Sequence, residues 1–210
     1  MKIDCLILGV YQTNCYVLRD KPASKECLII DTGLNSGKML EFLTETLSEP
    51  VAVVLTHGHA DHIAGLAELR KSYPKIKVYI HKLDAVMLAD SRTNLSELSG
   101  QKFKADSADF LLEEGNLIEQ AGINLTVLHT PGHTPGGICL YSKNEDVAFV
   151  GDTLFAHSVG RCDLPGGQLD ELIKGIKEKL LVLPDQTVVY PGHGPMTTIG
   201  QEKTHNPFLL

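Results

Sequence analysis

Side chains that commonly bind metal ions are concentrated in one short stretch of the sequence. His57, His59, Asp61 and His62 lie within six residues, directly after the apolar run Val51–Leu55. In an extended chain His57 and His59 point to the same side, whereas on a helix they would point about 200° apart. Asp61 and His62 can begin a following helix that turns back toward the same point. The spacing therefore predicts a group of metal ligands where a strand ends and a helix begins.

Three further potential ligands stand in similar local settings. Each follows an apolar, strand-like run and lies in a glycine-containing turn; they are His133, Asp152 and His193. Loops at one rim of a rigid scaffold are common places for a binding site. We therefore expect these side chains to meet the group at residues 57–62.

The number of potential ligands predicts two metal ions. Five histidines and two aspartates are too many for one ion and about right for two. We assign them to two groups that share a bridging Asp152: one ion is held by His57, His59 and His133, and the other by Asp61, His62 and His193. Each ion then keeps a position for solvent, which is typical of a catalytic site. These ligands suit divalent zinc, iron and manganese alike, and zinc is the expected metal.

The other histidines have simpler interpretations. We expect His81, His129 and His205 to be surface or hydrogen-bonded residues, because a single histidine among nine is seldom a ligand. His157 stays open, since it lies on the loop that follows Asp152.

The order of the elements predicts a mixed α/β protein. Strand-like runs occur at 3–8, 14–18, 27–31, 51–55, 77–80, 124–129, 138–141, 147–150 and 187–190. Helical spacing occurs at 35–47, 62–73 and 169–181, and the polar stretch 89–107 is expected to be a long surface excursion. Because strands and helices do not alternate regularly, we expect two packed sheets with helices outside, in a single domain spanning residues 1–210.

Composition excludes several classes of partner. The 210 residues carry a net charge of −7 without a basic stripe, so a nucleic-acid partner is not expected. The longest apolar runs fall well short of the roughly 20 residues that cross a bilayer. The five cysteines show no CxxC pair, and no charged-then-apolar leader is evident, which together predict a cytoplasmic protein. The oligomeric state is left open.

Several motifs together resemble the metallo-β-lactamase superfamily and, within it, the glyoxalase II-like (hydroxyacylglutathione hydrolase-like) hydrolases. The matching segments are Thr13–Tyr16, Ile30–Gly33, His57–His62, Gly132–His133, Gly151–Phe155 and Pro191–Gly194. The resemblance implies a four-layer αββα sandwich with a dinuclear site on the rim where the sheets meet. It also implies that Asp31 supports the site from behind the ligands, although a simple strand-ending turn would explain this residue as well. The C-terminal helical domain of glyoxalase II is missing.

Residue types distinguish the branches of this superfamily. The best-known β-lactamases have Cys where Asp152 stands, and flavodiiron-type oxidoreductases have Glu in place of His59, so the resemblance disfavours both activities. Glyoxalase II has a basic and then an aromatic residue that contact glutathione. Here Arg161 keeps the positive charge and is the candidate substrate-binding residue, but Asp163 replaces the aromatic hydroxyl. A surface or intramolecular salt bridge is the alternative role for Arg161.

The resemblance implies a metal-dependent hydrolase that cleaves a small, lactoyl-glutathione-like thioester by attack of a metal-bridging hydroxide. Asp61 and Asp152 are the candidate catalytic residues. The alternative is a persulfide dioxygenase of the same fold, with one iron held by His57, His133 and Asp152. A non-catalytic metal-binding or sensory module is a third possibility. The acyl group, the thiol carrier and the role of residues 89–107 stay open.

Overall fold

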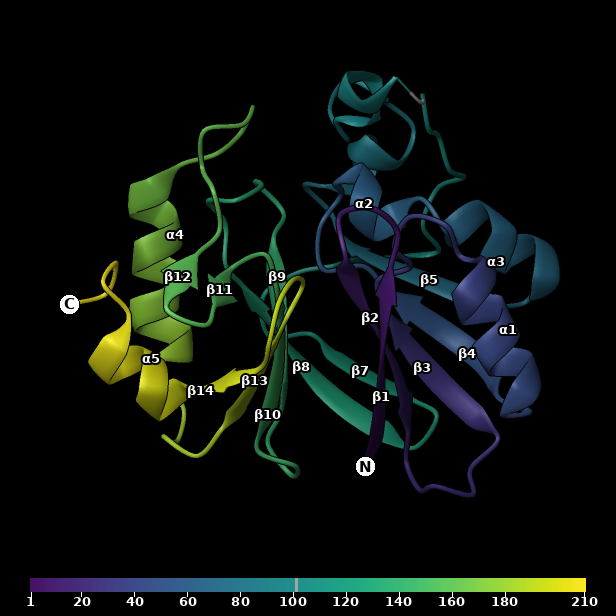
Figure 1. Cartoon of the computed structure of the whole chain (residues 1–210), viewed down its shortest axis with the longest axis horizontal. Helices are drawn as coiled ribbons and strands as arrows, with labels where there is room; N and C mark the ends of the chain where they lie inside the picture. Colours follow the sequence, from purple (N-terminus) through teal and green to yellow (C-terminus); the bar gives the residue numbers. More distant parts are fainter. Residues whose placement is uncertain (101) are drawn as a thin grey trace.

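Two six-stranded sheets form the centre of the computed structural model, which describes residues 1–100 and 102–210 (Figure 1). The first sheet has the order β1-β2-β3-β4-β5-β6, with bounds Lys2–Leu8, Thr13–Arg19, Glu26–Ile30, Glu49–Val54, Lys77–His81 and Phe110–Leu112. The second has the order β14-β13-β10-β9-β8-β7, with bounds Thr197–Thr198, Val188–Pro191, Val147–Gly151, Ile138–Ser142, Ile123–His129 and Leu117–Gln120. Both sheets are mixed: β3 to β6 pair in parallel, as do β10 and β13, and the other neighbours are antiparallel. A short hairpin joins β11 (Leu154–Phe155) to β12 (Ser158–Val159).

Helices cover the outer face of each sheet. On the first sheet lie α1 (Gly37–Glu45), α2 (Ala60–Ile63) and α3 (Leu66–Ser72), whose apolar side chains share one buried cluster with that sheet. On the second lie α4 (Leu169–Gly175), the π-helical turn η3 (Ile176–Leu180) and α5 (Ile199–His205), packed in a separate cluster. The layers thus run helix, sheet, sheet, helix, and the expected αββα sandwich is confirmed.

The strands of the first sheet are apolar on both faces because each face meets another layer. Along β2, Cys15 and Val17 pack in the cluster beneath the helices, whereas Tyr16 and Leu18 pack in the cluster between the sheets. Every residue of β2 is buried. The continuous apolar runs in the sequence therefore reflect burial from two sides.

Three aromatic rings fasten the two sheets together. Phe149 of β10 is fully buried and lies 5.2 Å from both Tyr16 of β2 and Tyr190 of β13, measured between ring centroids. Burial raises the pKa of Tyr16 far above its usual range, so its hydroxyl stays protonated. That hydroxyl donates a hydrogen bond of 2.6 Å to the carbonyl oxygen of Pro191. The contact links the first sheet to the end of β13, close to His193.

Two predicted helices are interrupted. The helix expected over 62–73 is two helices, because the carbonyl of His62 accepts hydrogen bonds from the amide and hydroxyl of Thr32. Gly65 then donates its amide to Gly33 instead of continuing the helix. The helix expected over 169–181 changes to π-type hydrogen bonding at Ile176.

Some elements had no counterpart in the sequence prediction. These are the short edge strands β6, β7 and β14, the β11–β12 hairpin, helix α5 and the 3₁₀ turn η1 (Ala85–Leu88). The stretch 89–107 is mostly irregular, as expected, but contains a second 3₁₀ turn, η2 (Ser96–Ser99); its position 101 lies outside the described residues. Within the described part of the chain, no helix is long and apolar enough to cross a membrane.

We expect Phe149→Ala to destabilise the protein strongly, because the substitution leaves a cavity between the sheets. The free energy of unfolding, measured by denaturant titration, should fall by about 3–5 kcal/mol. Phe208→Ala is the matched control: Phe208 is 50% exposed, so its removal should change stability by about 0.5 kcal/mol or less. Equal effects of the two substitutions would show that the aromatic cluster does not fasten the sheets.

Candidate metal centre

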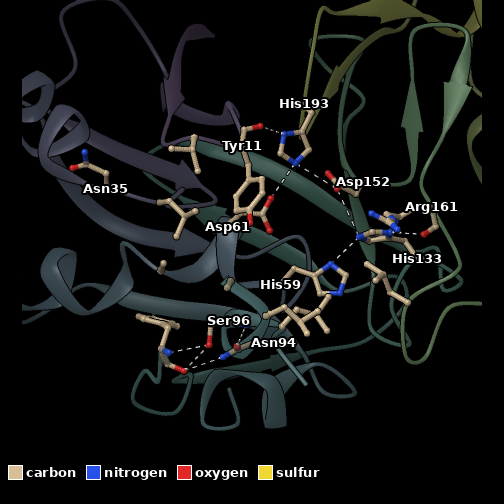
Figure 2. Close-up of a pocket in the computed structure, with 18 of the residues that line it drawn as sticks. Tyr11, Asn35, His59, Asp61, Asn94, Ser96, His133, Asp152, Arg161 and His193 are labelled. Atoms are coloured by element: carbon tan, nitrogen blue, oxygen red, sulfur yellow. Dashed lines mark hydrogen bonds and ion pairs between the residues drawn. The ribbon is translucent and has the colours of Figure 1, made fainter. Parts of the chain in front are cut away.

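The seven predicted ligands meet at one end of the two sheets (Figure 2). The segment at 57–62 follows β4 of the first sheet, whereas the other three side chains follow β8, β10 and β13 of the second. Their potential ligand atoms form three overlapping groups, within each of which all atoms lie within 4.8 Å of one another. The groups are His57, His59 and His133; Asp61, His62 and His193; and His57, His62 and Asp152.

The first triad brings three imidazole nitrogens together. Nδ1 of His59 lies 3.1 Å from Nε2 of His57 and 2.9 Å from Nε2 of His133. All three side chains are buried. Burial, followed by the neighbouring imidazoles, lowers the pKa of His57 well below its usual range and that of His59 to about 3. His57 and His59 therefore present neutral rings, the form in which histidine binds a metal ion.

The second triad contains a carboxylate. Nε2 of His193 lies 3.3 Å from Nε2 of His62 and 3.2 Å from an oxygen of Asp61. Burial lowers the pKa of His62, but the charges of Asp152, Asp31 and Asp61 outweigh it and raise the pKa. The surroundings of this triad thus favour a positive charge.

Asp152 lies between the triads. Its Oδ1 is 3.3 Å from Nε2 of His62, and its Oδ2 is 3.7 Å from Nε2 of His133 and 3.5 Å from Nε2 of His193. Although Oδ1 is buried, it has no hydrogen-bond partner among the described residues. A buried carboxylate oxygen without a partner is costly, so this atom points to a missing cation.

In three of these rings a hydrogen bond at the outer nitrogen, Nδ1, determines that the other nitrogen, Nε2, faces the centre. Nδ1 of His133 lies 2.8 Å from the carbonyl oxygen of Arg161, and Nδ1 of His193 lies 2.9 Å from that of Tyr11. Nδ1 of His62 lies 2.8 Å from a carboxylate oxygen of Asp31. Because oxygen is the acceptor in each pair, Nδ1 carries a hydrogen and Nε2 is the nitrogen that faces the centre, where it could donate its lone pair to a bound cation.

Asp31 supports two ligands at once. Its Oδ1 accepts from the amide of Thr56, and its Oδ2 accepts from the hydroxyl of Thr56, both at 2.8 Å. Since that hydroxyl donates to Asp31, it can accept from Nδ1 of His57 at 3.1 Å. The same Oδ2 accepts from His62, as described above. The position of Asp31 thus agrees with the supporting role that the resemblance implies.

Asp84 is a supporting residue that sequence analysis missed. Its Oδ2 accepts from the amide of Gly58 at 2.9 Å and from the hydroxyl of Thr134 at 2.7 Å, and its Oδ1 accepts from the amide of Gly136 at 2.6 Å. The side chain is fully buried, and burial raises its pKa despite these donors. Asp84 therefore joins the loop around His57 and His59 to the loop that carries His133. Nothing in its local sequence indicates this role.

The side chains fit a pair of divalent ions. Nitrogen and carboxylate oxygen atoms converge in two groups of three, and a carboxylate with a free oxygen stands between them. Zinc, iron and manganese accept such ligands, and the geometry does not select one.

The other predicted residues lie outside this centre. The guanidinium of Arg161 forms two hydrogen bonds of 2.7 Å with Asp163, the salt bridge that was the alternative for this residue. His81 and His129 stack with ring centroids 4.0 Å apart, and His157 faces His205 at 6.2 Å. None of these four histidines belongs to a candidate metal group among the described residues.

A cleft of about 1070 Å³ opens over the centre. Its wall combines the β1–β2 loop (Val10 and Tyr11) and the α2–α3 region with residues of the η2 turn and on either side of it. The opposite part of the wall comes from the β11–β12 hairpin and the loop that follows it, through Phe155, Arg161 and Leu164. Five of the seven candidate ligands, His59, Asp61, His133, Asp152 and His193, line it. Part of the excursion, between Asn94 and Leu98 and at Lys102 and Phe103, therefore borders the space that a substrate would occupy.

Comparison with known proteins places this centre among related ones. The family model for the metallo-beta-lactamase superfamily matches residues 8–193. The "Probable metallo-hydrolase YqgX" of Bacillus subtilis is 40% identical over 100% of this chain and 98% of its own length. The "Hydroxyacylglutathione hydrolase GloC" of Haemophilus influenzae is 35% identical over 100% and 98%, respectively.

Two solved structures are similar over nearly the whole chain. The "BLEG-1 B3 metallo-beta-lactamase" has a TM-score of 0.94 at 40% identity, covering 99% of both chains. The protein TTHA1623, solved in a di-iron-bound form, has a TM-score of 0.86 at 36% identity, covering 98% of this chain and 100% of its own. The fold therefore occurs in a family that includes a protein solved with two iron ions bound.

Asp31→Asn should weaken metal binding, because the asparagine amide would face the nitrogen–hydrogen group of His62 and no longer orient that ring. We expect metal affinity, measured by competition with a chelator, to fall by about 10–100-fold. Asp146→Asn is the matched control, since Asp31 and Asp146 share a left-handed backbone with φ of 56° and 50°. Unchanged affinity in Asp31→Asn would contradict the supporting role.

Asp84→Asn should affect both stability and metal binding, because an amide would face at least one of three buried donors. The free energy of unfolding should fall by about 1–3 kcal/mol, and one of two metal equivalents should become easier to remove with a chelator. Asp106→Asn, a substitution of an exposed aspartate, serves as the control. If stability falls while both metal equivalents stay equally tight, Asp84 is only a structural residue.

Proposed function

The chain belongs to the metallo-beta-lactamase superfamily, and on that premise we propose that it is a dinuclear hydrolase of small thioesters of the lactoyl-thiol kind. Membership of this family supports a metal-dependent hydrolase in general. The number of ions and the bond that is cleaved need separate arguments.

The position of Asp152 carries the proposal of two ions. Its oxygens lie within 3.3–3.7 Å of His62, His133 and His193, which belong to both triads. A single ion would leave one triad and one carboxylate oxygen without a partner. The di-iron form of TTHA1623 supports the same occupancy.

Bound divalent ions would supply Lewis acidity and an activated water at neutral pH. The chain contributes the geometry for that chemistry. Asp31, Thr56 and two backbone carbonyls hold the imidazole rings in one tautomer, so no reorganisation is needed when a substrate enters. Asp61 lines the cleft beside His193. Although burial raises the pKa of its carboxyl, the imidazoles of His62 and His193 lower it overall, so Asp61 stays a carboxylate that can hold an ion or orient water.

A thioester is the favoured substrate class for two reasons. The relative GloC, similar over the full chain, is described as a hydroxyacylglutathione hydrolase. A thiolate is also a good leaving group with affinity for the metals that suit this centre. These arguments support a thioester over an oxygen ester.

Two other reactions deserve a direct comparison. A persulfide dioxygenase would use one iron held by His57, His133 and Asp152, and would leave the second triad without a role. The 40% identical BLEG-1 structure is named as a B3 metallo-beta-lactamase, so a β-lactam is a further substrate class to test.

The decisive experiment compares three classes of substrate on protein loaded separately with zinc, iron and manganese. We expect cleavage of S-lactoyl and S-acetyl thioesters to exceed hydrolysis of a chromogenic cephalosporin, and we expect no oxygen uptake with a persulfide. Oxygen uptake by the iron form without thioester cleavage would overturn the proposal, as would a preference for the cephalosporin.

Asp152→Asn tests the bridging role. Thioester turnover should fall at least about 100-fold and the content of bound metal should drop from two equivalents, because a ligand common to both ions is lost. Asp170→Asn, an exposed aspartate at the start of α4, should leave both quantities unchanged. Full turnover by Asp152→Asn would rule out a bridging carboxylate.

A further inference from the structure

The cleft is far larger than the centre at its base. Its volume of about 1070 Å³ is at the upper end for a small-molecule site, and a lactoyl group would fill only a small part of it. The remaining wall determines which substrates fit.

Exposed apolar side chains stand along this wall. Val10 and Tyr11 of the β1–β2 loop are 87% and 54% exposed, and Leu98 is 78% exposed. Leu34 and Phe103 continue the same lining. Large apolar groups exposed together beside a candidate active site indicate a surface that a ligand covers.

The basic groups of the wall already have partners. Among the described residues that line the cleft, the basic side chains other than histidine are Lys102 and Arg161. The ammonium of Lys102 lies 3.0 Å from a carboxylate oxygen of Glu97. Arg161 is held by Asp163 through two hydrogen bonds, and it lowers the pKa of that carboxyl to about 2. Each positive charge is therefore balanced by an adjacent negative one.

An acidic group stands at the end of the cleft away from the second sheet. Glu68 of α3 lines it and accepts a hydrogen bond from the hydroxyl of Ser36. In the described part of the chain Glu68 forms no ion pair with a basic residue. A substrate carboxylate near this end would meet repulsion, and burying it without a cation would be costly.

We propose that the cleft selects thioesters whose part remote from the reacting carbonyl is an uncharged, apolar chain, and that the pairing of Asp163 with Arg161 disfavours anionic carriers. This inference rests on the proposed thioesterase function and deepens it. The apolar chain lies between the β1–β2 loop and the stretch around Leu98, where Val10, Tyr11 and Leu98 line the cleft.

Binding of thioethers, which cannot be cleaved, tests the selection directly. The probes are the S-hexyl and S-ethyl derivatives of N-acetylcysteine amide and the S-hexyl derivative of N-acetylcysteine, titrated into metal-loaded protein by calorimetry. A buried methylene raises affinity by about fourfold. We expect the hexyl amide to bind at least about tenfold tighter than the ethyl amide and about tenfold tighter than the hexyl acid. Equal affinities, or tighter binding of the acid, would overturn the proposal.

Two variants locate the apolar and the charged parts of the selection. Leu98→Ser should reduce the ratio of hexyl to ethyl affinity by about threefold, whereas Leu117→Ser, an equally exposed leucine on β7 outside the cleft, should leave it unchanged. Asp163→Asn should raise the affinity for the acid relative to the amide by about threefold, because it frees Arg161. An unchanged acid-to-amide ratio in Asp163→Asn, or equal effects of the two leucine variants, would contradict the assignment.

The thioether binding experiment and the test of thioesterase activity can fail independently of each other. If no thioester is cleaved, thioesterase activity is wrong, while the thioether affinities still decide which chemistry the cleft accepts. If thioesters are cleaved but the acid binds best, the function stands and the inference about the carrier fails.

Discussion

Imidazole nitrogens and carboxylate oxygens, whose lone pairs repel one another, are held close together at one end of the two sheets. The rest of the structure keeps them in this arrangement. Five imidazoles and two carboxylates converge, and the ligand atoms within each group lie within 4.8 Å of one another. Each ring that turns Nε2 inward is fixed from outside by an oxygen acceptor, such as Asp31 behind His62. A cation relieves the repulsion at the centre, whereas the outer hydrogen bonds keep the geometry ready for it.

The constraint also explains why two sheets must pack in one register. His57, His59, Asp61 and His62 follow the first sheet, and the other ligands follow the second. Asn14 of β2 donates to the carbonyl oxygens of Pro191 and Gly194, on either side of His193, at 3.0 and 2.9 Å. Asp84 makes the matching link to the loop of His133. The aromatic core between the sheets and these polar links together fix distances that neither sheet could fix alone.

The metal centre and the cleft have different roles, since the centre provides the ligands for the reaction and the cleft selects the substrate. The fold is common to a family whose similar members are described by different reactions, so the fold alone does not select a substrate. Selection falls to the β1–β2 loop, the stretch around Leu98 and the Arg161–Asp163 pair. In these parts each basic side chain is paired with an acidic one, and we therefore expect the substrate chain to be uncharged.

The sequence by itself determined the types and spacing of the seven side chains, the apolar runs of the buried strands, and hence the layered fold. These features are local, because the period of a strand or helix and the chemistry of a side chain can be read residue by residue. Only the tertiary structure decided that Asp84 joins the loop of Gly58 to the loop of Thr134, which lie 26 and 50 residues from it along the chain. It also decided that Thr32 hydrogen-bonds to the carbonyl of His62 and ends α2, and that Arg161 is paired with Asp163. Such partners depend on which distant segments the packed sheets bring within hydrogen-bond distance, or on which rotamer a surface side chain adopts, and no local pattern encodes either.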